Sequence, residues 1–213
     1  MASPATSEYY AGLIDAQLSV GLAKNASTRV TLASNDPRVA EQLAAKFCPT
    51  RVTIVKRPDK KDLCTALFQG DAAKDLLTFA SEHCVLKKDL AKKALEYIES
   101  NATAEDVKDV PAVSELDNVS LEWASGFFDV RGIIVTPMAA TDDTKKRRGS
   151  VKLVLPKNEK FVLPALQKVL HGKVKKSSPC RLVYESKDAI KHFVETIGDH
   201  VRAKKDDLEA VMA

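Results

Sequence analysis

Hydrophobic and polar positions change their period several times along the chain, and these changes predict its helices and strands. A mostly apolar stretch over residues 7–15 predicts a helix, and alternating residues over 17–24 and 28–34 predict two strands joined by a hairpin. Val39, Leu43 and Phe47 recur at the spacing of one helical face, after a helix start signal at residues 35–37. Further strands are expected at 51–55 and 63–68, followed by helical residues over 71–98, interrupted near 84–88.

The same order of elements returns in the second half of the chain. We expect a helix over 119–129, strands over 131–137 and 150–155, a helix over 158–170, strands near 172–176 and 180–185, and a helical region from 186, interrupted near 200–205. Residues 101–117 lack helical apolar spacing and contain Pro111, which predicts a linker. The pattern therefore predicts an α+β protein with one repeat at 1–100 and a second at 118–213.

One short motif occurs in the first helix of each repeat. Residues 10–17 read YAGLIDAQ and residues 124–132 read ASGFFDVRG, so an Asp follows three residues after Gly12 and after Gly126. Glycine inside a helix costs about 1 kcal/mol relative to alanine, and close approach of two backbones is the usual reason to keep it. We therefore predict that Gly12 and Gly126 are the interface residues of two helices that pack against each other.

These motifs resemble those of the LAGLIDADG family of homing endonucleases and maturases, and the resemblance covers nearly the whole chain. It implies two LAGLIDADG-type αββαββα repeats related by pseudo-twofold symmetry, forming a saddle of antiparallel sheets. It also implies a monomer with an internal pseudo-dimer. The family's activity is divalent-metal-dependent DNA cleavage, in which the acidic residue two places after the shared Asp holds the metal. Lys87 and Lys204 align with a basic position that family enzymes place beside the active site, and an Asp-containing helix start follows each.

The two metal-binding positions depart from the family pattern. They hold Gln17 and Arg131 in this chain, whereas hard divalent cations need oxygen ligands and a guanidinium brings a fixed positive charge. Asp15 and Asp129 remain, but they lie about 200° around the helix from those positions and are expected to serve helix-end structure. We therefore expect no cofactor and no catalytic residues, with Mg²⁺ required only if the chain is an active endonuclease.

Basic and polar residues on the predicted strands are the candidates for nucleic-acid binding. Alternation places Arg29 and Thr31 opposite Val30 and Leu32, and it places Arg51 and Thr53 opposite Val52 and Ile54, with the apolar face expected under the helices. Lys173, Lys175 and Lys176 are expected in the turn between two strands. The full candidate set is Lys24, Arg29, Thr31, Arg51, Thr53, Arg131, Lys145, Lys146, Arg147, Arg148, Lys152, Lys173, Lys175 and Arg181. For each residue, a solvated structural role remains the alternative to phosphate contact.

Composition narrows the class of protein without identifying a function. The chain has 213 residues, of which 45% are hydrophobic and 29% charged, and a net charge of +4; no apolar run approaches the roughly 18 residues of a membrane span. Residues 1–117 carry 15 Lys and Arg against 17 Asp and Glu, and residues 118–213 carry 18 against 12, so the second half suits a polyanion better. Cys48, Cys64, Cys84 and Cys180 show no paired spacing and are expected to be free thiols.

Three functions are compatible with these observations. The first is a catalytically degenerate LAGLIDADG-like protein that binds DNA or structured RNA, with other proteins of an RNA–protein assembly as further partners and no membrane. The second is an active double-strand DNA endonuclease, and the third is a protein-interaction module that retains only the fold. The family suggests a mitochondrion or chloroplast. The 27 Ala against 7 Ile and 5 Asn suggest a nuclear gene.

Overall fold

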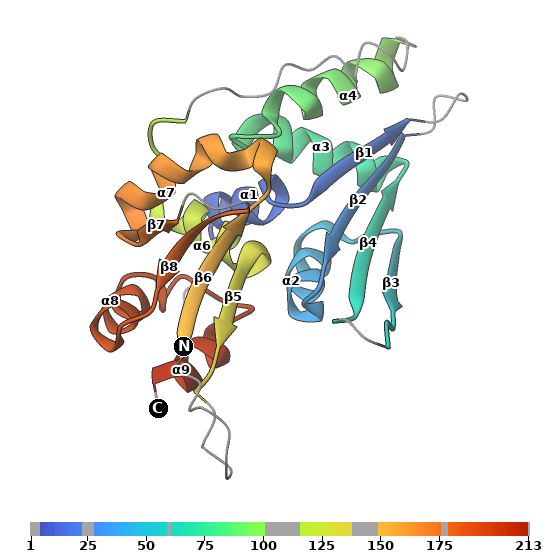
Figure 1. Ribbon diagram of the computed structural model, residues 1–213. Coiled ribbons are helices and arrows are strands. Elements are labelled where there is room, and N and C mark those ends of the chain that lie inside the picture. Colours follow the sequence, from blue (N-terminus) through green and yellow to red (C-terminus); the bar gives the residue numbers. More distant parts are fainter. Residues whose placement is uncertain are drawn as a thin grey trace. The chain divides into compact units, whose positions relative to one another are not determined.

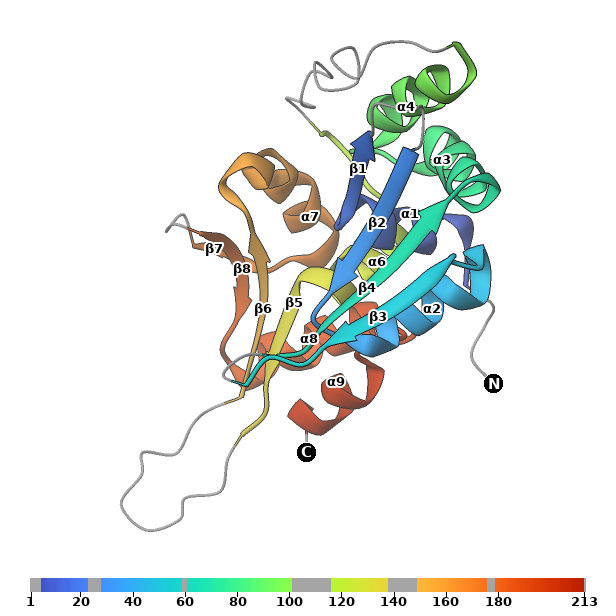
Figure 2. The same ribbon diagram turned by 90° about the vertical axis from the view of Figure 1, so that its right-hand side faces the viewer.

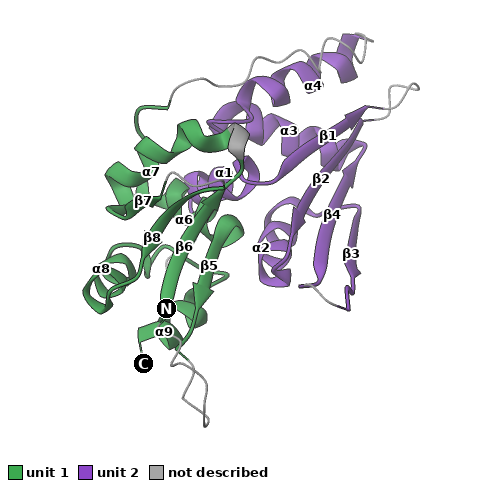
Figure 3. Ribbon diagram, viewed as in Figure 1, with its two compact units in different colours: residues 1–4, 114–213 green, residues 5–113 purple. Residues whose placement is uncertain are grey.

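The computed structural model describes residues 5–22, 28–58, 61–100, 116–137, 149–175 and 179–212. The chain forms two compact units, residues 5–113 in purple and residues 114–213 with the N-terminal tail in green (Figure 3). We call these units the first repeat and the second repeat. The binding candidates Lys24, Lys145, Lys146, Arg147 and Arg148 lie outside the described residues, as do Lys176 and most of the predicted linker.

The elements of the first repeat follow the sequence pattern closely. They are α1 (Ser7–Asp15), β1 (Leu18–Leu22), β2 (Thr28–Ser34), α2 (Pro37–Phe47), β3 (Arg51–Val55), β4 (Leu63–Gln69), α3 (Asp71–His83) and α4 (Lys88–Ser100). The side chain of Thr6 caps α1, and that of Asp36 caps α2, each accepting a backbone N–H of the first turn. The predicted order of elements is therefore confirmed.

The second repeat has the same order, with two differences from the prediction. Its elements are α6 (Leu121–Arg131), β5 (Gly132–Val135), β6 (Ser150–Leu155), the 3₁₀ helix η1 (Lys157–Val162), α7 (Leu163–Leu170), β7 (Lys173–Lys175), β8 (Cys180–Tyr184), α8 (Lys187–Ile197) and α9 (Lys205–Met212). The helix expected to stop at Asp129 continues to Arg131. The helix expected over 158–170 starts as a 3₁₀ turn, because Pro164 lacks an N–H and fits the first turn of an α-helix.

Each repeat contains one four-stranded antiparallel sheet. The strand order is β1-β2-β4-β3 in the first repeat and β5-β6-β8-β7 in the second, so the two strand orders are equivalent (Figures 1 and 2). Helices α2 and α3 pack on β2 and β4, and helices α7 and α8 pack on β8. The core lies between these layers and includes the fully buried Leu32, Phe68, Leu76, Phe128 and Phe193. Each sheet is therefore covered by helices on one face.

None of the helices among the described residues is long and apolar enough to cross a membrane.

Candidate functional site

The Asp of the first motif ties the end of α1 to the start of α4. The Asp15 carboxylate is fully buried and accepts hydrogen bonds from the backbone N–H groups of Val85, Leu86 and Lys87 at 2.7, 2.9 and 2.8 Å. These residues immediately precede Lys88, the first residue of α4. The first N–H groups of a helix lack intrahelical acceptors, so a carboxylate in this place satisfies them. The helix-end role expected for Asp15 is confirmed.

The Asp of the second motif makes the same set of contacts. The Asp129 carboxylate accepts hydrogen bonds from the backbone N–H groups of Arg202, Ala203 and Lys204 at 2.9, 3.0 and 2.9 Å, just before α9. Lys87 and Lys204 therefore occupy equivalent places. Lys204 is buried, and its ammonium group donates to the backbone carbonyl of Asp129. Lys87 is half-buried, and a role for either Lys beside a reacting centre stays a prediction.

The two degenerate positions hold groups that do not fit a divalent cation. Gln17 follows α1, and both polar atoms of its side-chain amide are buried with no hydrogen-bond partner. Arg131 is the last residue of α6, and its Nη2 donates to Oε1 of Glu159 in η1 at 3.2 Å. Glu159 is the third residue of η1, and no pattern in the sequence linked it to Arg131. The ion pair ties the Arg131 guanidinium to η1, and the phosphate contact expected of Arg131 stays a prediction.

The donor chemistry of these positions supports no metal-dependent step. A neutral amide is a weaker ligand than a carboxylate, and a carboxylate engaged by a guanidinium competes poorly for Mg²⁺. Among the described residues, no group of three or more His, Cys, Asp or Glu side chains is close enough to hold a metal ion. We therefore derive no cleavage chemistry at Gln17 or Arg131.

The face of the first sheet that its helices leave uncovered carries polar side chains with two cations. We call this the first open face. Pairing across the strands gives one row of side chains from Ser19 through Thr31 and Leu67 to Arg51. The flanking rows place Arg29 beside Gln69, and Thr65 beside Thr53. Arg29, Arg51 and Thr53 are exposed and Thr31 is half-buried, so the predicted face exists.

Strand β3 contradicts one part of the prediction. Val52 and Ile54 were expected under the helices, but their side chains are 47% and 55% exposed. The reason is the position of β3 at the edge of the sheet, beyond β4. Helix α2 packs on β2 and β4, and alternation along a strand says nothing about how far the helical layer extends over it.

The equivalent face of the second sheet, which we call the second open face, collects four cations. One row runs from Ile133 through Lys152 and Val183 to Lys173, and the next runs from Val154 through Arg181 to Lys175. The strand expected near 172–176 is β7, so Lys173 and Lys175, which were also expected in the turn that follows it, lie within a strand that pairs with β8. Strand β7 therefore extends the face, with Lys175 opposite Arg181 and with Val183 between Lys173 and Lys152.

The two open faces can be compared position by position. Ser19 and Ile133 each follow the motif Asp by four residues, and Leu67 and Val183 each precede a helix cap by three residues. With this register, Lys152 stands at the position of Thr31, and Lys173 at that of Arg51. Lys175 stands at the position of Thr53, and Arg181 at that of Thr65. The second open face is thus the more strongly basic of the two.

One carboxylate lies among these cations. Glu185 follows β8 and accepts a hydrogen bond from Nζ of Lys175 at 2.6 Å. That hydrogen bond, together with the charges of Lys175, Lys152 and Lys173, lowers the pKa of Glu185. Glu185 was not among the predicted binding residues, although the alternation of Arg181, Val183 and Glu185 along the expected strand places it on this face.

Arg181 also carries an unsatisfied donor. Its Nε is buried and has no hydrogen-bond partner, although a buried N–H without an acceptor is costly.

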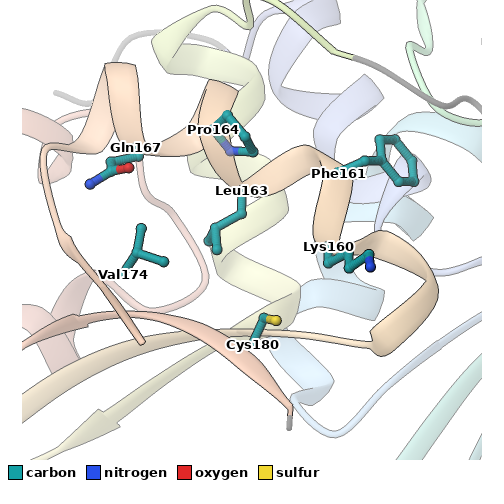
Figure 4. A pocket seen from close by; sticks show the side chains of 7 residues that line it. All are labelled: Lys160, Phe161, Leu163, Pro164, Gln167, Val174 and Cys180. Atoms are coloured by element: carbon teal, nitrogen blue, oxygen red, sulfur yellow. The ribbon is translucent and has the colours of Figure 1, made fainter. Parts of the chain in front are cut away.

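A cavity of about 660 Å³ lies on the other side of the second sheet (Figure 4). Leu163 points from α7 toward Val174 of β7 and Cys180 of β8, and Lys160, Phe161, Pro164 and Gln167 complete the lining. Val174 and Cys180 lie in the rows that face the helices. The cavity is therefore separate from the second open face.

Gly12 and Gly126 are both buried within their helices. Their predicted contact concerns the placement of the two units relative to each other, so it stays a prediction.

Comparison with known proteins gives a clear result for structure and none for sequence. No protein-family model matches the chain. No curated protein matches it either.

Solved structures of LAGLIDADG homing endonucleases match nearly the whole chain. The meganuclease I-SmaMI bound to uncleaveable DNA has a TM-score of 0.69 and 14% sequence identity, covering 98% of this chain and 88% of that chain. I-AabMI bound to uncleaved DNA has a TM-score of 0.66 at 13% identity, covering 96% and 88%. I-LtrWI bound to target DNA has a TM-score of 0.66 at 17% identity, covering 95% and 87%. The fold implied by the two sequence motifs is confirmed.

Proposed function

We propose that this chain, which has the two-repeat LAGLIDADG fold, binds duplex DNA through its open sheet faces and does not cut it. The observation that carries the proposal is the set of four cations on the second open face, from three neighbouring strands. Such a face suits phosphate contacts, which supply most of the affinity of nucleic-acid binding.

The structural neighbours favour DNA as the first ligand to test, because I-SmaMI, I-AabMI and I-LtrWI were solved with DNA. At 13–17% identity these proteins support the fold, and the choice of ligand belongs to the proposal. Structured RNA remains the alternative ligand, because its phosphates would bind to the same cations.

The absence of cleavage is proposed from the residues at the two degenerate positions. Gln17 and Arg131 stand where the resemblance requires carboxylates, and Arg131 is engaged by Glu159. Incubation with a randomised duplex DNA library and Mg²⁺ or Mn²⁺ should leave the DNA intact. Double-strand products at a defined sequence would instead establish the endonuclease alternative.

Salt dependence tests the binding face directly. The logarithm of affinity should fall with the logarithm of salt concentration by about 0.9 per phosphate contact on B-DNA. Replacing Lys152, Lys173, Lys175 and Arg181 together by Ala should flatten that slope by roughly 2–4 units. The matched control replaces four lysines on helices, namely Lys46, Lys92, Lys93 and Lys191, and should change the slope much less.

The outcomes separate the candidate functions. Equal slopes for wild type and the open-face variant, or no binding of DNA at low salt, would overturn the proposal. Tighter binding of a structured RNA of equal length would replace DNA by RNA as the ligand. If neither nucleic acid binds, the protein-interaction module becomes the leading hypothesis.

A further inference from the structure

Strand β3 has an exposed edge with an unusual composition. It is the outermost strand of the order β1-β2-β4-β3, and all five of its residues are exposed. Val52, Ile54 and Val55 are 47%, 55% and 47% exposed, and the only other large apolar side chain with such exposure among the described residues is Ile133. Such a strand offers unpaired backbone groups together with apolar surface, which favours pairing with another chain.

The equivalent edge in the second repeat is protected against such pairing. Strand β7 is three residues long and reads Lys-Val-Lys, and short length and lysines are the usual devices that prevent edge pairing. Strand β3 is longer and carries Val, Thr, Ile and Val after its single cation, Arg51. The two equivalent edges of the same fold therefore differ in their protection against strand pairing.

The apolar side chains of β3 lie mainly on the helix-facing side of the sheet. Val52 pairs with Ala66, which pairs with Leu32 in the buried layer, and Ile54 pairs with the buried Cys64. The row of Leu32, Ala66 and Val52 thus runs from the buried core to the exposed edge strand. An added strand would extend this row and cover Val52 and Ile54, which buries apolar area.

We propose that β3 is a docking edge for an extended segment of a partner protein, which adds a fifth strand to the first sheet. The segment carries apolar residues at alternate positions, to pack against Val52 and Ile54, and acidic residues at its ends. The acidic residues face Arg51 at the start of β3 and the exposed Lys56 that follows it. Main-chain hydrogen bonds supply affinity, and the alternating side chains supply specificity.

Charge argues against a second copy of this chain as the occupant. Antiparallel pairing of two β3 strands centred on Thr53 would place Arg51 of one copy opposite Val55 and diagonally beside Arg57 of the other. Parallel pairing in register would place Arg51 opposite Arg51. Like charges across a strand pair are destabilising. A partner strand with acidic residues at its ends is instead attracted by Arg51 and Lys56.

This docking edge does not depend on the proposed DNA binding. It uses the outer backbone edge and the helix-facing side chains Val52 and Ile54, and Arg51 is the one residue that it shares with the first open face, which is on the other side of the same sheet. A chain that binds no DNA could still bind the partner strand.

The test is a selection from a displayed library of random twelve-residue peptides. The full-length protein is the bait, with counter-selection against the variant V52K/I54K, which gives β3 the lysines that natural edges use. Enriched peptides are expected to alternate apolar residues and to carry Asp or Glu near their ends. V52K/I54K should bind them at least about tenfold more weakly, which corresponds to 1.4 kcal/mol.

Four further measurements test the mode of binding. I133K removes an equally exposed apolar side chain from the other sheet and should bind the peptides like wild type. Peptides N-methylated at alternate residues along one edge should lose binding if backbone pairing is essential. Hydrogen exchange in the complex should slow at residues 51–56. The variant V52T/I54T keeps branched side chains at both positions and should bind the peptides with intermediate affinity.

The proposal fails if no peptide prefers wild type over V52K/I54K, or if the enriched peptides are basic at their ends. It also fails if exchange slows at another surface and not at β3. A concentration-dependent dimer of wild type that V52K/I54K abolishes would assign the edge to a second copy and overturn the partner strand.

Discussion

At the scale of single residues, Asp15 and Asp129 make equivalent contacts in the two repeats. Each carboxylate accepts three backbone N–H groups from a segment more than 60 residues away in the sequence. The residue two places later differs, because Gln17 has a buried amide without a partner and Arg131 pairs with Glu159. The shared Asp is therefore structural, whereas the residue two places later differs between the repeats in both type and contacts.

Asp129→Asn tests the structural role. The amide retains one oxygen acceptor but turns an N–H₂ donor toward backbone donors, so at least one buried N–H loses its partner. Hydrogen bonds to charged groups contribute about 1.5–3 kcal/mol each, and we expect a loss of about this size in the free energy of unfolding. Urea unfolding measures it, and the exposed Asp199→Asn serves as the control. A change below about 0.5 kcal/mol, the usual range for surface substitutions, would contradict the role.

Glu185→Gln tests the carboxylate within the basic face. Glu185 pairs with Lys175 and lies near Lys152 and Lys173, so it offsets part of the charge that a polyanion would meet. The variant should bind DNA more tightly than wild type at low salt, with a steeper salt dependence. Binding titrations at several salt concentrations would show this, and weaker binding by the variant would mean that Glu185 itself contacts the ligand.

The lowered pKa of Glu185 gives this prediction a pH dependence. The carboxylate stays charged throughout the neutral range, and it becomes neutral when pH falls through its lowered pKa, below the ordinary value of 4.5. Protonation removes the opposing charge, so wild-type affinity should approach that of Glu185→Gln as the pH falls. No such convergence is expected between pH 6 and 8.

At the scale of elements, sequence periodicity predicted what local interactions decide. The helix start at Asp36 and the interruption before α4 were both predicted, because each depends on residues within a few positions. The side chain of Val52 was misplaced because its exposure depends on where α2 packs. A strand was predicted near 172–176, but Lys173 and Lys175 were placed in the turn after it, because the sequence does not mark where so short a strand ends.

Gly172 joins α7 to β7 and has a packing reason that the sequence does not show. A Cβ at this position would lie 2.5 Å from Cγ of Leu182 and 2.6 Å from Cζ of Tyr184, both buried. Gly172→Ala should therefore destabilise the protein by about 1–3 kcal/mol through overpacking. Gly21→Ala is the matched control, since its nearest neighbour, the carbonyl oxygen of Arg29, is 3.6 Å away. Equal unfolding midpoints for the two variants would contradict the prediction.

At the scale of the whole molecule, charge is divided unequally between two repeats of one fold. The sequence predicted this division from its net charges, and the strand registers give it a location. The first open face carries Arg29 and Arg51, whereas the second carries four cations and Glu185. What the sequence could not provide is the counterpart of each cation, such as Glu159 for Arg131, because these pairs form between elements that only the fold brings together.

This division predicts unequal contributions to binding. Replacing Arg29 and Arg51 together by Ala should flatten the salt dependence of DNA affinity by roughly 1–2 units. The loss should be smaller than that caused by replacing the four cations of the second open face. The first open face is richer in uncharged Thr, Ser and Gln side chains, so its variant should change sequence preference more. An equal effect of the two variants on slope and preference would contradict the division.

The contacts of Asp15 and Asp129 also have a consequence for the order of folding. Each joins residues separated by at least 70 positions, and closing such a long loop early in folding is entropically costly. These hydrogen bonds should therefore form after the transition state, once the sheet and its helices are in place. Their loss in Asp15→Asn or Asp129→Asn would then accelerate unfolding and leave the refolding rate nearly unchanged. We therefore expect the hydrogen bonds of the two carboxylates to form last and to set the lifetime of each folded repeat.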